Sequence, residues 1–273
     1  DIVDVNTVWA VPYDGTGGAA NYQEFTKTTD GGTNWTVRPI DLGDTDLGIS
    51  MISAIDDMNA WLVAYPQAAG DVGGIWKTTD GGANWNRQAS ADFNDGSGAS
   101  FANVVHFWDA NNGFCQGDPI GAGNGEFELY TTTDGGANWN LVPGANIPNP
   151  NAGEYGYVRD IEVVGDTVWF GSNNGRLYRS PDRGYNWTVF NTPETDMGNA
   201  SYSFRDGSTG LMNIGGVIHK TTDGGANWSL VTTTGTVAES QICFIEDTDV
   251  AFTTGTGSSY SEDGGTTWNV IDT

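Results

Sequence analysis

The stretch Thr28-Thr29-Asp30-Gly31-Gly32-Thr33-Asn34-Trp35 recurs, with small changes, five more times along the 273 residues of the chain. Every copy fits the pattern Ser/Thr-x-Asp-x-Gly-x-x-Trp. We predict that each copy is a turn between two strands. Its Asp accepts hydrogen bonds from the turn's own backbone, its second Gly adopts a positive φ, and its Trp opens the next strand. The aspartates are Asp30, Asp80, Asp134, Asp182, Asp223 and Asp263, and the tryptophans are Trp35, Trp85, Trp139, Trp187, Trp228 and Trp268.

The spacing of this box predicts the architecture. Successive box aspartates are 40 to 54 residues apart, which is typical of one blade of a β-propeller. Short apolar runs upstream of the boxes give each unit four strands, with the box turn between the third and the fourth. We therefore predict an all-β, six-bladed β-propeller with four antiparallel strands per blade. It is a single domain over residues 1–273, with blades at about 1–40, 41–90, 91–145, 146–192, 193–233 and 234–273.

With six such boxes, the chain resembles the BNR or Asp-box β-propellers. That family includes sialidases, the sortilin ectodomain and the photosystem II assembly and stability factors. The resemblance covers essentially the whole chain and implies the fold. It implies no activity, because the box of these families is structural and lies on the face opposite the ligand. A truncated terminus would hide a further strand or a seventh blade.

Charge and composition exclude some classes of protein. The chain has 10 Lys and Arg against 35 Asp and Glu, a net charge of −25, which excludes a nucleic-acid binder with a basic face. No apolar run approaches the roughly 18 to 20 residues that cross a membrane, so we expect no membrane insertion. The chain starts at Asp1 without a Met, which predicts excision from a larger secreted or surface protein. Cys115 and Cys243 are predicted to be two buried thiols.

The loops suggest where a partner binds. From the second strand to the box Asp, blades 1 to 3 use 19 to 21 residues and blades 4 to 6 use 12 to 13. Binding residues concentrate in loops on a rigid scaffold, so we predict a ligand site on the long-loop face of blades 1 to 3. Drift of solvent-exposed loops is the alternative. The candidate ligand-binding residues are Tyr13, Tyr22, Tyr65, Phe93, Tyr155 and Tyr157, with Arg159 and Arg205 on predicted first strands.

Two acidic loops suggest a metal. Asp41, Asp44 and Asp46 form one group, and Asp92, Asn94 and Asp95 form another. Calcium prefers six to eight oxygen ligands, and such a loop supplies some of them. The first group is therefore our candidate calcium site, with a solvated acidic loop as the alternative. No other cofactor is predicted.

Catalytic residues are sparse. Sialidases need an arginine cluster, and this chain has seven scattered arginines and nothing that resembles the Phe/Tyr-Arg-Ile-Pro motif of those enzymes. Asp160 or Glu162 could be drawn as a pair with Tyr202 across blades 4 and 5, but such pairs arise by chance in an acidic chain. We assign no catalytic residue, and we favour a binding protein over an enzyme.

The sequence thus predicts a non-catalytic recognition or scaffold propeller of an exported, extracellular or cell-surface bacterial protein. Its partner would be a glycan or a protein, because the acidic surface repels anionic polymers. One alternative is a sialidase-like glycoside hydrolase. Another is an assembly factor resembling those of photosystem II, for which the family pattern leads us to expect an arginine-rich patch that the scattered arginines do not supply.

Overall fold

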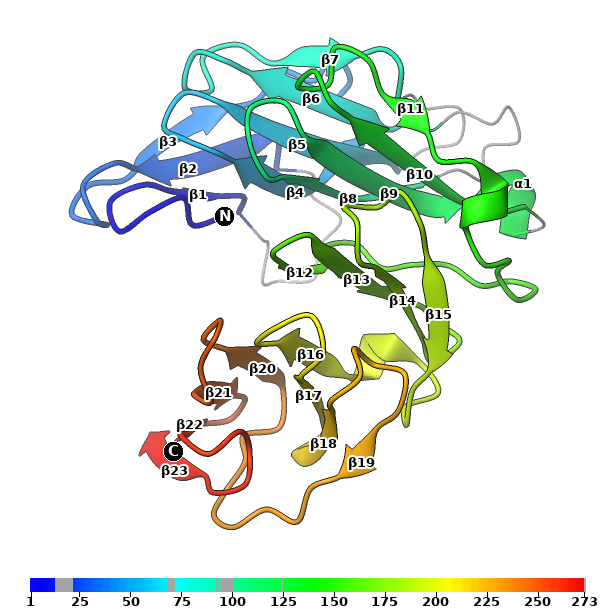
Figure 1. The fold of residues 1–273 in the computed structure, drawn as a ribbon. Helices are drawn as coiled ribbons and strands as arrows, with labels where there is room; N and C mark the ends of the chain where they lie inside the picture. Colours follow the sequence, from blue (N-terminus) through cyan, green and yellow to red (C-terminus); the bar gives the residue numbers. More distant parts are fainter. Residues whose placement is uncertain (13–21, 68–71, 92, 94–100, 124, 273) are drawn as a thin grey trace. The chain divides into compact units, whose positions relative to one another are not determined.

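The computed structural model describes residues 1–12, 22–67, 72–91, 93, 101–123 and 125–272. The described chain folds into antiparallel sheets that follow one another along the sequence (Figure 1). Its helical elements are α1 (Ile120–Gly123) and the 3-10 turns η1 (Gly144–Asn146) and η2 (Met197–Asn199). None of these described helices is long and apolar enough to cross a membrane.

The sheets belong to two compact units, each described by itself. The first unit is Asp1–Ala145 with Asn149–Gly153, and the second is Asn146–Pro148 with Glu154–Thr273. The first unit contains the strands β1 (Val8–Ala10), β2 (Glu24–Thr28) and β3 (Thr36–Pro39); β4 (Leu47–Ala54), β5 (Ala60–Pro66), β6 (Gly74–Thr78) and β7 (Asn86–Gln88); and β8 (Ala102–Phe107), β9 (Gly113–Pro119), β10 (Phe127–Thr132) and β11 (Asn140–Leu141).

The second unit also has three sheets, each of four consecutive strands. They are β12 (Glu162–Val164), β13 (Thr167–Gly171), β14 (Arg176–Ser180) and β15 (Thr188–Asn191); β16 (Ser201–Phe204), β17 (Gly210–Ile214), β18 (Val217–Thr221) and β19 (Ser229–Leu230); and β20 (Gln241–Phe244), β21 (Ala251–Thr254), β22 (Ser258–Ser261) and β23 (Asn269–Asp272). Six consecutive antiparallel sheets fit a six-bladed propeller, so the all-β prediction is confirmed.

The first sheet has three strands instead of four. Beside β1, Ile2 makes a single antiparallel bridge to Val8, and the N–H of Trp9 donates to the carbonyl of Asp1 at 2.9 Å. The start of the chain therefore occupies the place of a first strand without forming a full one.

The turns between third and fourth strands share one hydrogen-bond pattern, which β6–β7 illustrates. The Thr78 hydroxyl donates to Asp80 Oδ1 and accepts from the N–H of Gly82, both at 2.9 Å. Asp80 also accepts from the side-chain amide of Asn84 at 2.7 Å and from its backbone N–H at 2.9 Å, which lowers the Asp80 pKa to about 2. Gly82 has a φ of +85°, which the missing Cβ permits. Bonds within the turn are joined by one distant bond, from the N–H of Gly81 to the carbonyl of Met58 at 3.0 Å.

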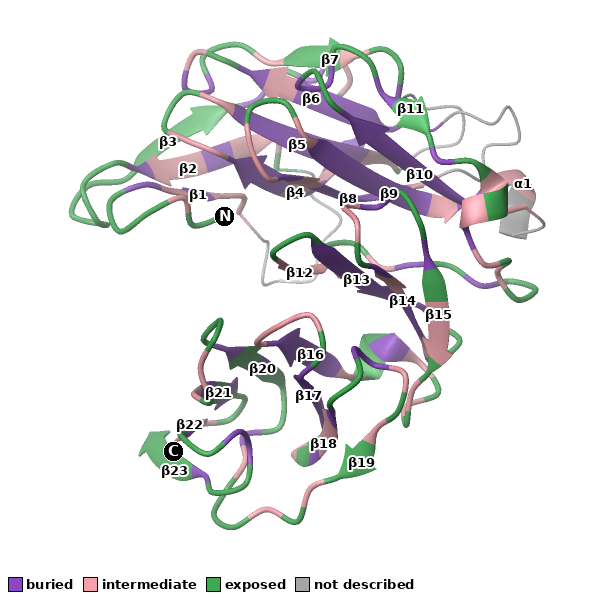
Figure 2. Cartoon of the chain, in the orientation of Figure 1, coloured by how far each residue is buried: buried purple, intermediate pink, exposed green. Residues whose placement is uncertain are grey.

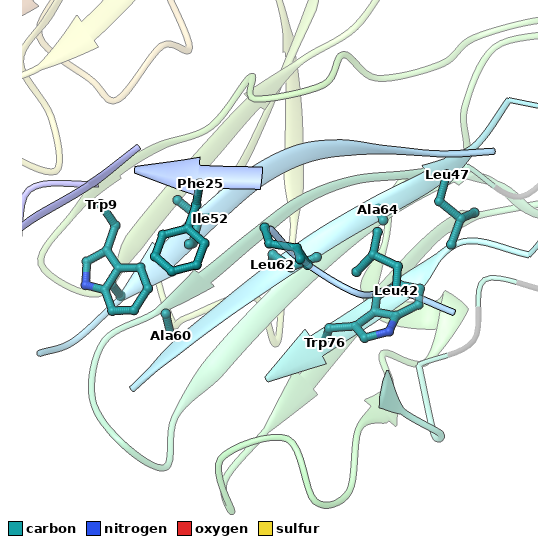
Figure 3. Close-up of a cluster of buried hydrophobic side chains, with 11 residues drawn as sticks. Trp9, Phe25, Leu42, Leu47, Ile52, Ala60, Leu62, Ala64 and Trp76 are labelled. Carbon is teal, nitrogen blue, oxygen red and sulfur yellow. The ribbon is translucent and has the colours of Figure 1, made fainter. Parts of the chain in front are cut away.

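The core lies between neighbouring sheets. Figure 3 shows the cluster between the first two sheets, with Trp9 and Phe25 at one end and Trp76 at the other. In the second unit, Trp169 stacks on Phe204 of the next sheet at a centroid distance of 4.0 Å. The outer strands β3, β7, β11, β19 and β23 are mainly exposed (Figure 2). Packing of inner strands against the next sheet therefore supplies most of the apolar burial.

A recurring cation also joins neighbouring sheets. Lys77 lies over the Trp61 ring at 4.6 Å, and its Nζ donates to the carbonyl of Gly135, in the box turn of the next sheet, at 3.0 Å. The indole N–H of Trp61 donates to the same carbonyl at 3.1 Å. We call this arrangement the cation clasp. Lys27, Arg179 and Lys220 occupy the same position before their boxes and donate to carbonyls of the following sheet.

Two sheets lack the clasp cation. At the clasp position, β10 has Thr131 and β22 has Tyr260, and neither side chain carries a positive charge. These are the last sheets of the first and of the second unit. Within each unit, every sheet that is followed by another therefore carries the cation.

The two cysteines differ in burial. Cys115 is buried, and burial raises its pKa well above the usual value. Cys243 is exposed, so the prediction of a buried thiol is wrong there. In β20 the side chains of Ile242 and Phe244 are buried, and a strand points successive side chains to opposite faces. Cys243 therefore faces away from that core.

Candidate functional site

The second unit contains a cavity of about 220 Å³ where its three first strands, β12, β16 and β20, begin. Side chains bridge these strands. Glu162 of β12 accepts from the N–H of Phe204 at 2.8 Å, and the N–H of Ile242 donates to Ser201 Oγ at 3.0 Å. The polar residues that line the cavity are Arg159, Asp160, Glu162, Ser201, Tyr202 and Gln241, and we call it the carboxylate pocket.

Two carboxyl groups dominate the electrostatics of the carboxylate pocket. Burial raises the pKa of Asp160 to about 6, although the N–H of Gly171 donates to its Oδ2 at 2.8 Å. Burial also raises the pKa of Glu162 to about 7, and the negative charges of Asp160 and Glu246 add to that rise. Because desolvation disfavours a charged carboxyl, both groups hold protons at higher pH than exposed carboxyls do.

The phenol of Tyr202 completes the pocket. Its side chain is 8% exposed, and its buried hydroxyl lies beside the carboxyl of Asp160, with which it interacts. Burial and the nearby charge of Asp160 raise its pKa well above the usual value. The phenol of Tyr202 and the carboxyl of Asp160 therefore line the pocket as an interacting pair.

The segment that leads into β12 brings three of the predicted ligand residues together. Tyr155 is 44% exposed and meets Tyr157 edge to face, with ring centroids 5.6 Å apart. The hydroxyl of Tyr157 donates to Asp196, and its backbone carbonyl accepts from the N–H of Asp160 at 3.3 Å. Arg159 lies in the turn between this tyrosine pair and the carboxylate pocket. The exposed Tyr155 and the half-buried Tyr157 therefore adjoin the pocket in the sequence and through the bond from Asp160 to Tyr157.

The two candidate arginines are not brought together. Arg159 precedes β12 instead of lying on a strand, and it has a φ of +65°. Arg205 follows β16 and pairs with Asp206 at 3.1 Å and with Asp249. Because first strands of neighbouring blades run in the same direction, the start of β12 and the end of β16 lie at opposite ends of the two strands. An arginine cluster of the sialidase type therefore does not form from this pair.

The remaining aromatic candidates lie in the first unit. Tyr22 is exposed, whereas Tyr65 stacks on Phe101 at 4.7 Å. Phe93 is 2% exposed and packs against Tyr130, so it is a core residue and not a surface for a ligand. Tyr13 lies outside the described residues, as do 13–21, 68–71 and 94–100 of the long loops. The long-loop site stays a prediction.

The structure gives the calcium prediction no support. Asp41 accepts from the N–H of Gly43, and Asp44 accepts from the N–H of Asp46, both at 2.9 Å. These carboxylates stabilise their own turns, and Asp41 and Asp44 line a broad hollow of about 920 Å³. Across the ranges that the structure describes, no three His, Cys, Asp or Glu side chains gather as metal ligands. Asp92, Asn94 and Asp95 lie outside those ranges.

No family model matches the chain. In sequence the chain is similar to the photosystem II assembly lipoprotein Ycf48 of Synechococcus sp. (strain CC9902), with 27% identity over 171 residues. The match covers 61% of this chain and 48% of the relative, so the chain spans about half the length of that protein.

Solved structures agree on the fold. Ycf48 bound to a D1 peptide superposes with a TM-score of 0.67 at 17% identity, covering 98% of this chain and 78% of that one. The fold is that of Ycf48. Two GH74 enzymes share the fold alone. An ancestral GH74 enzyme superposes with a TM-score of 0.60 at 13% identity, covering 99% of this chain and 39% of that one. The GH74 enzyme of Niastella koreensis superposes with a TM-score of 0.57 at 18% identity, covering 93% of this chain and 43% of that one.

These comparisons correct one sequence prediction. The prediction of an extracellular or cell-surface protein is wrong, because the similar curated protein is a photosystem II assembly lipoprotein. The comparisons do not show that the chain belongs to the BNR family.

Proposed function

We propose that this chain is a protein-binding propeller that acts as an assembly factor of the photosystem II type. The observation that carries the proposal is the sequence similarity to Ycf48 over 171 residues. The peptide-bound Ycf48 structure, which shares the fold, supports a partner that presents a short segment of its chain.

We place the peptide site at the carboxylate pocket and the neighbouring Tyr155. A cavity of about 220 Å³ is smaller than the roughly 300 to 1,000 Å³ of drug-sized ligand sites, so it suits one long side chain. An exposed tyrosine beside such a pocket supplies contact area at low entropic cost. A peptide would thus insert one side chain into the pocket and lay its neighbours over Tyr155.

The test measures the binding of overlapping D1 peptides by fluorescence anisotropy. The chain offers a matched pair of variants, because Tyr155 is 44% exposed and Tyr185, in the box turn between β14 and β15, is 42% exposed. We expect at least one peptide to bind, and Tyr155→Ala to weaken it about tenfold while Tyr185→Ala leaves it unchanged. Absence of binding by every peptide would refute the proposed function, and equal losses in the two variants would refute the location.

A further inference from the structure

We infer that the first unit binds an extended, positively charged segment of another protein in the hollow of about 920 Å³ beside Trp85. We call this cavity the Trp85 hollow. The inference goes beyond the proposed function, because it names a second site, away from the carboxylate pocket where we place the D1 peptide. Three observations carry it: a backbone donor and acceptor without partners, the filling of the same place in other sheets, and the charge of the hollow.

The box turn of the second sheet has two backbone groups without partners, on residues that line this hollow. Ala83 and Trp85 both line it, and they lie before β7, outside the ladder of that strand with β6. Among the residues that the structure describes, the carbonyl of Ala83 accepts no hydrogen bond and the N–H of Trp85 donates none. A carbonyl and an N–H two residues apart are the groups through which one extended residue of a second, parallel segment pairs with a chain.

In the last sheet, a segment of the chain itself occupies the corresponding place. Thr234 forms an isolated parallel bridge to the box before β23. Its N–H donates to the carbonyl of Thr266 at 2.9 Å, and its carbonyl accepts from the N–H of Trp268 at 2.8 Å. Thr266 and Trp268 stand at the positions of Ala83 and Trp85 in the shared motif. The geometry that we infer for a bound segment is thus already present within this chain.

Two further sheets fill this place with a residue from the segment that precedes them. The carbonyl of Asn146 accepts from the N–H of Trp187 at 2.9 Å, and its side-chain amide donates to the carbonyl of Tyr185 at 3.1 Å. Ser90 Oγ accepts from the N–H of Trp139 at 2.8 Å. In the described ranges, the boxes of the first and fifth sheets lack such an acceptor, so a box turn forms without this bond.

The segment that leads into β4 is held away from the box by Gln23. The side-chain amide of Gln23 donates to the carbonyls of Asp44 at 2.6 Å and of Leu47 at 2.9 Å. The N–H of Ile40 donates to the carbonyl of Gln23 at 2.7 Å. Ile40 and Asp44 therefore belong to one wall of the hollow, and the box turn with Trp85 belongs to the other.

The walls of the hollow favour a positively charged segment. Asp41 and Asp44 line it, and each accepts one N–H of its own turn, which leaves other lone pairs of the carboxylate for a ligand. No Lys or Arg is among the described residues that line it, and all ten Lys and Arg of the chain lie in the described ranges. The half-buried Trp85 packs edge-on against Phe25 at a centroid distance of 6.0 Å and adds an aromatic surface on which a guanidinium can stack.

The experiment uses the full chain, labelled for NMR, and the blocked peptide Ac-Arg-Thr-Thr-Gly-Arg-NH₂, in which the central Thr takes the part of Thr234. We expect the amide signal of Trp85 to shift, and those of Trp187 and Trp268 to stay, because their N–H groups already have acceptors. Methylation of the nitrogen of the central Thr removes the donor to Ala83 and should weaken binding about fivefold. Replacement of both Arg by Glu should weaken it by about the same factor.

Variants of the protein test the charge of the wall. Asp41→Asn combined with Asp44→Asn should remove most of the preference for the Arg peptide over the Glu peptide. Asp46→Asn is the matched control and should keep that preference, because Asp46 is exposed on the same segment and is not among the described residues that line the hollow.

Three results would overturn the inference. The first is a Trp85 amide that does not shift with the Arg peptide, and the second is equal binding of the methylated peptide. The third is a set of shifts confined to the amides of Gly171 and Phe204, which donate to Asp160 and Glu162 and report on the carboxylate pocket. Because no D1 peptide is used, each of these results leaves the proposed function to its own test.

Discussion

Replacing Glu162 by Gln should stabilise the protein at about pH 8 and leave its stability unchanged at about pH 4. The carboxyl titrates at 4.5 when exposed and at about 7 in the folded chain. The pKa of Glu162 is higher in the folded chain than in the unfolded chain. The contribution of this carboxyl to the free energy of unfolding is therefore fully present below pH 4.5 and is lost as the pH rises through 7. The difference between the two pKa values corresponds to about 3 kcal/mol in the free energy of unfolding. Partial contact of Glu162 with solvent screens the charge and reduces this to about 2 kcal/mol.

Gln is a suitable replacement because it keeps an acceptor. Glu162 Oε1 accepts from Ser203 Oγ and from the N–H of Phe204, both at 2.8 Å, and an amide oxygen can take both bonds. Urea unfolding, followed by the fluorescence of the 11 tryptophans, gives the free energy of unfolding at each pH. An equal change in free energy at both pH values would refute the reasoning, as would destabilisation at the higher pH.

Three further substitutions test contacts that hold the sheets. Lys77→Met removes the clasp bond to Gly135 and should lower the free energy of unfolding by about 1–2 kcal/mol in urea titrations; an unchanged midpoint would mean that the clasp contributes nothing. Glu154→Ala leaves Arg176 largely buried without its carboxylate and should cost about 3–5 kcal/mol, against a smaller loss in Glu154→Gln; equal losses would contradict the charge argument. Asp182→Ala removes the acceptor of its turn and should lower the thermal midpoint by the equivalent of about 1 kcal/mol, and a rise in that midpoint would contradict the role of the turn bonds.

The fold could be predicted because its turns are local. Thr78, Asp80 and Asn84 lie within seven residues of sequence, and their bonds depend on residue type alone. The cation clasp was missed although its residues recur, because Lys77 reaches a carbonyl 58 residues further along the chain. Noting that a Lys or Arg precedes four of the six boxes would have revealed the pattern.

The candidate site was harder to predict than the fold. Asp160, Glu162 and Tyr202 were recognised in the sequence and treated as a chance pairing, because spacing does not show which strand starts lie side by side. Burial, which raises both carboxyl pKa values, depends on packing that no single segment determines. Phe93 was misplaced for a related reason, since a single apolar residue between polar neighbours can point inward from a loop.

The cation clasp has a consequence for the way such a chain can evolve. Its acceptor is a backbone carbonyl, as at Gly135, and a carbonyl survives any substitution of the residue that carries it. A duplicated gene segment therefore encodes the acceptor carbonyl of the clasp whatever residue stands there. The neighbouring sheet has only to supply a Lys or Arg side chain or an indole N–H as the donor. A chain built in this way can keep the contact between two neighbouring sheets while the sequence of the acceptor turn changes, as the four sheets that carry the cation illustrate.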